Sequence, residues 1–184
     1  MSRIPTPATI AAAPAAAQPL LEAVRKQVGS APNLFRITAT SPAALEGYLS
    51  MSGALGKGVL NAATRERIAL AVADINGCDY CLAAHTYLGK NVAKLLSDAE
   101  IAANRSGRSG DAKANAAVAF AAKVTKNRGA VTDADFAEVR GAGYSDAEIV
   151  EIVAHVALNT LTNYINEVFK TEVDFPVVPV KLAA

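Results

Sequence analysis

The sequence has no tryptophan and only two cysteines, and aromatic residues make up 5% of its 184 residues. A core of large rings is therefore excluded, and the 52% of hydrophobic residues, dominated by alanine, must pack as small side chains. Alanine has the highest helix propensity, and alternating strand patterns are nearly absent. The composition predicts an all-α fold, and this length favours a single domain.

An excess of charge of one sign is also missing. Lysine and arginine total 18 against 17 aspartate and glutamate, and the basic residues are dispersed along the chain. This pattern lacks the basic patch that nucleic acids or anionic lipids require. No apolar run approaches the roughly 20 residues that span a bilayer. We therefore expect a soluble protein with neither a nucleic-acid nor a membrane partner.

Residues 1–18 are rich in alanine, and Pro5, Pro7 and Pro14 interrupt any apolar stretch that could act as a signal-peptide core. We expect this segment to be a flexible lead-in to one helical domain over residues 19–184. Two cysteines only three positions apart are typical of a redox or metal pair and cannot join distant parts of a fold. Together these features favour a reducing cytoplasm.

Helix start signals recur beyond the lead-in, and they predict seven or eight helices. These signals are a cap at Asn61 or Thr64, a start at Thr132, and capping boxes at Ser97–Glu100 and Ser145–Glu148. The predicted helices cover residues 42–55, about 62–76, 78–96, 98–105 and 111–126, one that begins near 132, and 145–169. The polar stretch 105–110 is the best candidate for an exposed loop. The segment 174–180 contains two prolines, so we expect it to be extended and to pack along a neighbour.

The two cysteines stand in Cys78-Asp79-Tyr80-Cys81, and His85 follows four residues later. If a helix begins at Cys78, the advance of about 100° per residue places both thiols and the imidazole on one face. The helix dipole favours a thiolate at its N-terminus, and a neighbouring imidazole can accept the proton. Cys81, one turn from His85, gains most from the histidine.

Glu66 precedes Cys78 by twelve residues, which is about 18 Å along a straight helix. Gly77 allows the chain to reverse, and in an antiparallel helical hairpin Glu66 comes within one turn of His85. The carboxylate then holds one imidazole nitrogen while the other faces Cys81. This is the order of orienter, base and nucleophile that activates a weak nucleophile.

A thiolate so placed can attack the terminal oxygen of a peroxide, and the second cysteine can convert the resulting sulfenic acid into a disulfide. The residues by themselves leave other interpretations open. Two thiolates, an imidazole and a carboxylate also make a zinc site. The pair could instead exchange disulfides without acting on peroxides, or it could belong to a purely structural or interacting subunit.

The pattern E-x11-C-x2-C-x3-H, formed by Glu66, Cys78, Cys81 and His85, resembles the alkylhydroperoxidase D-like branch of the carboxymuconolactone decarboxylase superfamily. The likeness extends from about residue 33 to 175, and the stretches 65–67, 76–85 and 159–164 are similar to the peroxidase-related subgroup. The decarboxylase branch lacks the cysteine pair, so decarboxylation is not expected.

The resemblance implies an all-α, single-domain helical bundle that assembles as a homo-trimer or homo-hexamer without a bound cofactor or metal. It implies that Glu66 and His85 relay protons while Cys78 and Cys81 cycle between dithiol and disulfide. We favour Cys81 as the attacking thiol. The expected function is antioxidant defence through reduction of alkyl or hydrogen peroxides. The expected reductant is a dithiol, with a dihydrolipoyl protein as the family's example.

Tyr80 departs from the family pattern, because the best-studied members have a second histidine directly before the second cysteine. Tyrosine is a poor base near neutral pH, so we expect a weakened relay or a different peroxide. His155 and Asn159, four residues apart, can face either a pocket or a subunit interface. Spacing does not decide their roles or those of Asn163 and Asn166, which stay outside the predicted site.

Overall fold

A computed structural model describes residues 2–176, which form helices and loops without a strand. The helices are α1 (Gln18–Val28), α2 (Asn33–Thr38), α3 (Pro42–Leu55), α4 (Ala62–Ile75), α5 (Asp79–Tyr87), α6 (Asp98–Arg105), α7 (Ala112–Lys126), α8 (Asp133–Gly141) and α9 (Asp146–Phe169). Two 3-10 turns, Ile10–Ala12 and Ala15–Ala17, precede α1, and a π-helical segment, Leu88–Val92, follows α5. The predicted all-α class is confirmed.

Side-chain caps fix the starts of most of these helices, as the sequence predicts. Asn61 accepts a hydrogen bond from a backbone amide in the first turn of α4, and Thr132 and Ser145 form complete capping boxes at α8 and α9. The box predicted at α6 forms only in half. Ser97 accepts from the amide of Glu100, but the Glu100 carboxylate bonds elsewhere.

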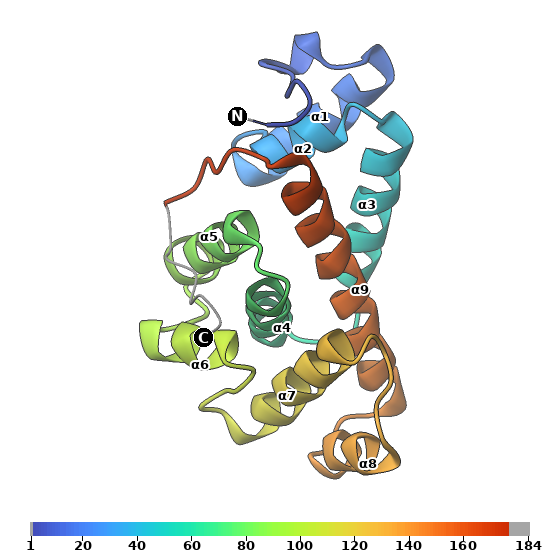
Figure 1. Cartoon of the computed structure of the whole chain (residues 1–184), viewed down its shortest axis with the longest axis vertical. Coiled ribbons are helices and arrows are strands. Elements are labelled where there is room, and N and C mark those ends of the chain that lie inside the picture. The colour runs from blue at the N-terminus through green and yellow to red at the C-terminus, as the bar shows by residue number, and fades with distance from the viewer. Residues whose placement is uncertain (1, 177–184) are drawn as a thin grey trace.

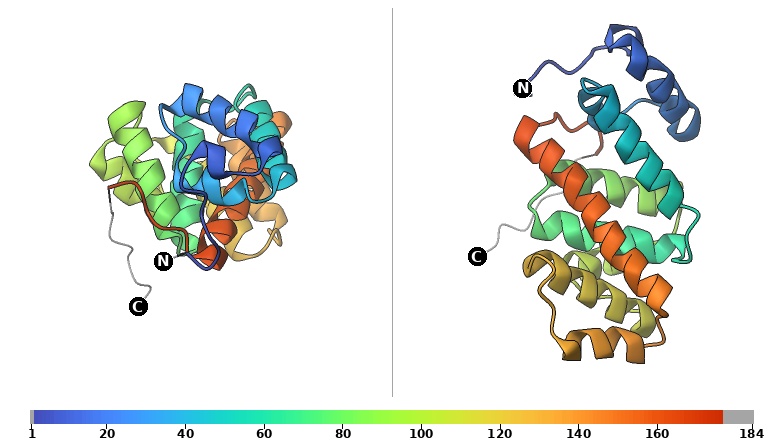
Figure 2. Two further views of the ribbon diagram at one scale, coloured as in Figure 1. Left: turned by 90° about the horizontal axis from the view of Figure 1, so that it is seen from above. Right: turned by 90° about the vertical axis from the view of Figure 1, so that its right-hand side faces the viewer.

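Helix α4 lies at the centre of the molecule and packs against α5, α6, α7 and α9 (Figure 1). Helices α1–α3 gather at one end, α7 and α8 lie at the other, and α9 runs along much of the length between them (Figure 2). Residues 68–73 of α4 are all buried, as expected of a helix surrounded by others. The central position of α4 brings Glu66 into the interior.

The helix predicted over 78–96 begins as expected but is shorter. Regular α-helix ends at Tyr87, and the chain continues as the π-helical segment until Lys94 adopts a positive φ of 53°. The carbonyl of Gly89 accepts hydrogen bonds from the amides of Leu95 and Leu96. These bonds turn the chain toward α6, and the predicted end near residue 96 is wrong.

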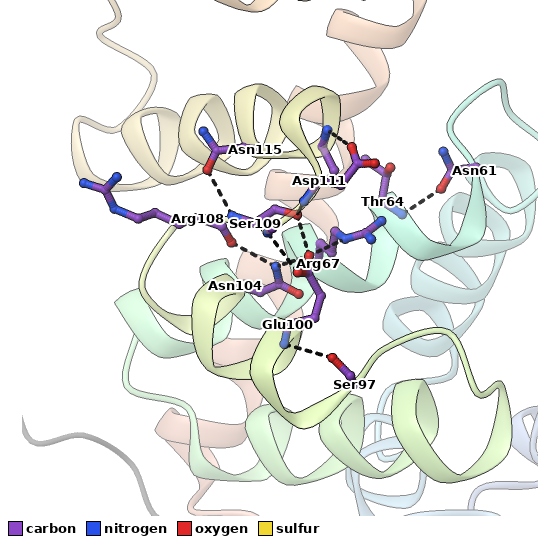
Figure 3. A network of polar contacts seen from close by, with 12 residues as sticks. Asn61, Thr64, Arg67, Ser97, Glu100, Asn104, Arg108, Ser109, Asp111 and Asn115 are labelled. Carbon is purple, nitrogen blue, oxygen red and sulfur yellow. Dashed lines mark hydrogen bonds and ion pairs between the residues drawn. The ribbon is translucent and has the colours of Figure 1, made fainter.

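The loop between α6 and α7, predicted as exposed, is tied to the helices around it by Glu100 (Figure 3). Its Oε1 accepts from Arg67 Nε at 2.7 Å, from Asn104 Nδ2 at 3.0 Å and from the hydroxyl of Ser109. Oε2 accepts from the amide of Gly110 at 2.9 Å. Burial by itself would raise the pKa of Glu100, but these four donors outweigh it and lower the pKa to about 2.

Residues 2–18, which the sequence predicts as a flexible lead-in, pack on the body of the protein. Ala13 and Ala17 are buried in one cluster with Leu21 and Leu45. Arg3 donates from its backbone and its side chain to carbonyls at the end of α9. The segment thereby covers the end of the molecule formed by α1–α3.

The chain after α9 turns back toward α2. The backbone amide of Asn33 donates to Asp174 Oδ2 at 2.8 Å, and Asn33 Nδ2 donates to the carbonyl of Glu172 at 2.9 Å. Of the extended tail predicted over 174–180, Asp174 and Phe175 contact the same chain, and residues 177–180 lie outside the described residues. Within residues 2–176 no helix is long and apolar enough to cross a bilayer.

Candidate active site

The hairpin of α4 and α5 places Glu66 beside His85. Gly77 has a φ of 66°, in the left-handed region that favours glycine, and it reverses the chain between the two helices. As a result, His85 Nδ1 lies 2.9 Å from Glu66 Oε2. Burial by itself would lower the pKa of His85, but the charge and the hydrogen bond of Glu66 together raise it. The carboxylate therefore favours the imidazolium form.

Both cysteines are free thiols at the start of α5, and both are buried. Cys78 is the N-cap residue, and its Sγ accepts a hydrogen bond from the backbone amide of Cys81 at 3.3 Å. Cys81 lies in the first turn of the helix. Their side chains are thus adjacent, as disulfide formation between them requires.

The surroundings of the two thiols separate their acidities. The hydrogen bond shared by the sulfurs favours the proton on Cys78, whose pKa is raised further by burial. The same bond lowers the pKa of Cys81 to about 7 against the opposing effect of burial, with additional help from the charge of His85. Cys81 therefore ionises first.

Two asparagines of α9 complete the environment of Cys81. Asn166 Nδ2 donates to Cys81 Sγ at 3.3 Å, and Asn163, one turn earlier, also lowers the pKa of Cys81. Both side chains are at most 2% exposed. Among the described residues, Asn163 Nδ2 and Asn166 Oδ1 have no hydrogen-bond partner. One buried donor and one buried acceptor thus remain beside the sulfur.

Sequence reasoning left these asparagines out of the site. The available signal was their spacing, because positions 159, 163 and 166 lie along one face of a largely apolar helix. That spacing indicates a buried polar line, but it does not indicate which group the line faces.

Tyr80 is an anchor for the C-terminal segment. Its hydroxyl donates to Asp174 Oδ1 at 2.7 Å and accepts from the backbone amide of Leu34 at 3.1 Å. The ring packs edge-on against Phe175. Burial raises the pKa of Tyr80 well above its ordinary value, so the hydroxyl stays protonated. The side chain that replaces the second histidine of the family therefore ties α5 to α2 and the tail.

A pocket of about 760 Å³ opens beside Cys81, with walls from α1, α3, α4, α5 and α9. Within the described residues, Cys81 and His85 line the pocket, whereas Cys78 does not. Tyr48 of α3 lies in the wall, and its pKa is raised to about 12 by burial and by the charges of Cys81 and Glu66. A small molecule in this pocket therefore reaches Cys81 before Cys78.

His155 and Asn159 of α9, which the sequence allows to face either a pocket or a subunit interface, lie in the wall of this pocket. Asn159 Nδ2 donates to the carbonyl of His155 at 2.8 Å, one turn earlier in the same helix. Within residues 2–176 neither side chain hydrogen-bonds to a cysteine sulfur, and His155 is only 5% exposed.

A zinc site needs three or four ligands around one point. Within residues 2–176, no three histidine, cysteine, aspartate or glutamate side chains come together in this way. The four predicted side chains instead form two pairs. His85 hydrogen-bonds to Glu66, and Cys81 shares a hydrogen bond with Cys78.

Comparison with known proteins gives the same family as the motif. Residues 42–123 match the model of the Carboxymuconolactone decarboxylase family. An alkylhydroperoxidase AhpD core, an uncharacterized peroxidase-related protein from Ralstonia eutropha, superposes with a TM-score of 0.82 at 26% identity over 94% of this chain and 92% of its own. A peroxidase-related protein from Silicibacter sp. superposes with a TM-score of 0.75 at 26% identity over 86% of this chain and 85% of its own.

The fold extends to other chemistry. A debrominase solved with 2,3,4-tribromopyrrole superposes with a TM-score of 0.78 at 18% identity over 95% of this chain and 94% of its own. No curated protein matches the chain in sequence. The motif, the matched family region over residues 42–123 and the peroxidase-related structures together support the assignment of this chain to the alkylhydroperoxidase D-like proteins of the carboxymuconolactone decarboxylase superfamily.

Proposed function

We propose that this protein is a thiol-dependent peroxidase in which Cys81 attacks the peroxide and Cys78 forms the disulfide. The observation that carries the proposal is the position of Cys81, whose pKa of about 7 makes it the more acidic thiol and whose side chain lines the pocket. At neutral pH about half of this thiol is the reactive thiolate.

In the first step the Cys81 thiolate attacks the terminal oxygen of the hydroperoxide. A sulfur–oxygen bond forms, the oxygen–oxygen bond breaks, and the leaving alkoxide takes a proton to become an alcohol. The imidazolium of His85, held by Glu66, is the proton donor that the geometry offers. Sulfur is oxidised by two electrons, and the peroxide is reduced by two.

The unpartnered amide atoms of Asn163 and Asn166 suit the product of this step. A sulfenic acid on Cys81 has an oxygen that can accept a hydrogen bond and a hydroxyl that can donate one. Asn163 Nδ2 and Asn166 Oδ1 are the buried donor and acceptor beside that sulfur. We assign these side chains the role of holding the transferred oxygen.

In the second step Cys78 loses its proton and attacks the sulfur of the sulfenic acid. The disulfide forms, and hydroxide leaves with a proton as water. Because the raised pKa of Cys78 keeps it protonated until then, it does not compete for the peroxide. A dithiol, such as a dihydrolipoyl group on a partner protein, then supplies two electrons and restores both thiols. These reactions fit a reducing cytoplasm.

The exposed face of α9 supports assembly into a homo-trimer or homo-hexamer. Five large apolar side chains on this helix are at least 43% exposed, namely Val150, Val153, Leu161, Tyr164 and Val168. Their spacing places them along a single stripe of the helix. An apolar stripe of this length is typical of a surface covered by another copy. Light scattering of the purified protein measures the mass of the assembly.

The test of the proposed function is thiol titration before and after one equivalent of cumene hydroperoxide. Two thiols per chain should disappear and return after treatment with dihydrolipoamide. Cys81→Ser should consume no peroxide. Cys78→Ser should consume one equivalent and stop with a sulfenic acid that dimedone labels at Cys81.

Two results would overturn the assignment. Peroxide consumption by Cys81→Ser at the parent rate would show that another group is the nucleophile. Oxidation of the pair by a small disulfide but not by any peroxide would instead identify a disulfide reductase.

A further inference from the structure

The pocket extends far beyond the reacting sulfur. Asn166, which bonds Cys81, and His155, in the wall of the pocket, lie eleven residues apart on α9, or about 16 Å along the helix. The volume of about 760 Å³ lies in the range of sites for organic ligands. Hydrogen peroxide would leave nearly all of this space empty.

The part of the pocket remote from Cys81 carries positive charge. Arg65 and Lys57 line the pocket, and Arg65 Nη1 donates to the carbonyls of Gly56 at 3.2 Å and Leu60 at 2.8 Å. These two bonds fix the guanidinium and use only part of its five N–H groups. The charge of Glu66, the next residue, is matched by His85. The lining therefore offers two cations, Lys57 and Arg65, in addition to the paired Glu66 and His85.

His155 adds a hydrogen-bonding group that has no use within the subunit. It is 95% buried, and its Nε2 has no hydrogen-bond partner among the described residues. Burial and the charge of Arg65 lower its pKa against the opposing charges of Glu151 and Glu66, and a neutral imidazole can donate one hydrogen bond. Buried polar atoms of this kind are uncommon unless a ligand or water pairs with them.

Apolar side chains also line the pocket, namely Val24 of α1, Leu49 of α3, Ala69 of α4 and Leu158 of α9. Such walls suit a hydrocarbon chain. We propose that the pocket binds an organic hydroperoxide that carries a carboxylate, with the peroxide at Cys81 and the carboxylate at Arg65 and His155. This specificity rests on the proposed peroxidase function and names the class of its substrate.

The kinetic test compares the 13-hydroperoxide of linoleic acid with its methyl ester, in which an added methyl group removes the carboxylate charge. The acid should have a kcat/KM at least tenfold higher, and Arg65→Gln should reduce this ratio at least fivefold. Arg140→Gln, which removes an exposed arginine on α8, serves as the matched control and should leave the ratio unchanged. Equal rates for acid and ester in the parent protein would overturn the proposal.

A binding measurement separates this proposal from the peroxidase function itself. Calorimetry with dodecanoate, which contains no peroxide, should show binding that weakens at least tenfold in both Arg65→Gln and His155→Phe. Dodecan-1-ol should bind at least tenfold more weakly than dodecanoate. If the protein binds dodecanoate but reduces no peroxide, the carboxylate site stands and the peroxidase function is refuted. If it reduces peroxides but binds dodecanoate and dodecan-1-ol equally well, the peroxidase function stands and the carboxylate site is refuted.

Discussion

The hydrogen bond from Asn166 to Cys81 offers the most direct test of how the fold sets thiol reactivity. Replacing Asn166 by leucine keeps the number and branching of the side-chain heavy atoms but removes the donor 3.3 Å from the sulfur. A hydrogen bond to a charged group contributes about 1.5–3 kcal/mol, which corresponds to about one to two pKa units. The pKa of Cys81 should therefore rise by at least about one unit from its value near 7.

This shift has a measurable consequence for the rate of alkylation. At pH 7 the ionised fraction of Cys81 should fall from about one half to about one tenth, so iodoacetamide should react about fivefold more slowly. At pH 10 Cys81 should react at similar rates in the parent and in Asn166→Leu, because it is then largely ionised in both proteins. Mass spectrometry of the peptide that contains Cys81 follows this residue separately from Cys78.

Asn159→Leu is the matched control, because Asn159 is on the same helix but bonds the carbonyl of His155. Its alkylation profile for Cys81 should match that of the parent. Loss of buried, partly unpaired polar atoms should not destabilise Asn166→Leu, so thermal unfolding near the parent temperature is also expected. An unchanged pH profile in Asn166→Leu, with the fold intact, would refute the role of this bond.

Two further predictions concern stability and the role of the tyrosine. Glu100→Gln should lower the free energy of unfolding at pH 7 by about 3 kcal/mol, because the carboxyl pKa falls from 4.5 in the unfolded chain to about 2 on folding. A carboxyl whose pKa is lowered by folding stabilises the protein fully above pH 4.5, and this stabilisation is lost as the pH falls toward 2. In urea unfolding, the free energy of unfolding of the parent should therefore decrease with falling pH more steeply than that of Glu100→Gln. Equal dependence on pH in the two proteins would contradict the role of the network. Tyr80→Phe should cost about 1 kcal/mol through loss of the bond to Asp174, measured by urea unfolding. Its pH profile of peroxide reduction should match the parent, and a changed profile would show that the tyrosine moves a proton.

Much of the fold follows from local rules that the sequence displays. Asn61, Thr132 and Ser145 cap the helices that they were predicted to begin, because capping needs only a short polar side chain next to a helical pattern. The end of α5 was not predictable in this way. It depends on a π-helical segment and on hydrogen bonds from the amides of Leu95 and Leu96 to the carbonyl of Gly89, which no local sequence pattern displays.

The four residues of the proposed site can be identified from the sequence, because Glu66 and His85 are joined by one hairpin whose reversal at Gly77 is a local signal. The groups around these four residues depend on how distant helices pack. Asn166 lies 85 residues from Cys81, and no local pattern predicts which buried asparagine meets which thiol. The physical reason is that helical periodicity defines a face, whereas the partner of that face is set by packing between helices that are distant in the chain.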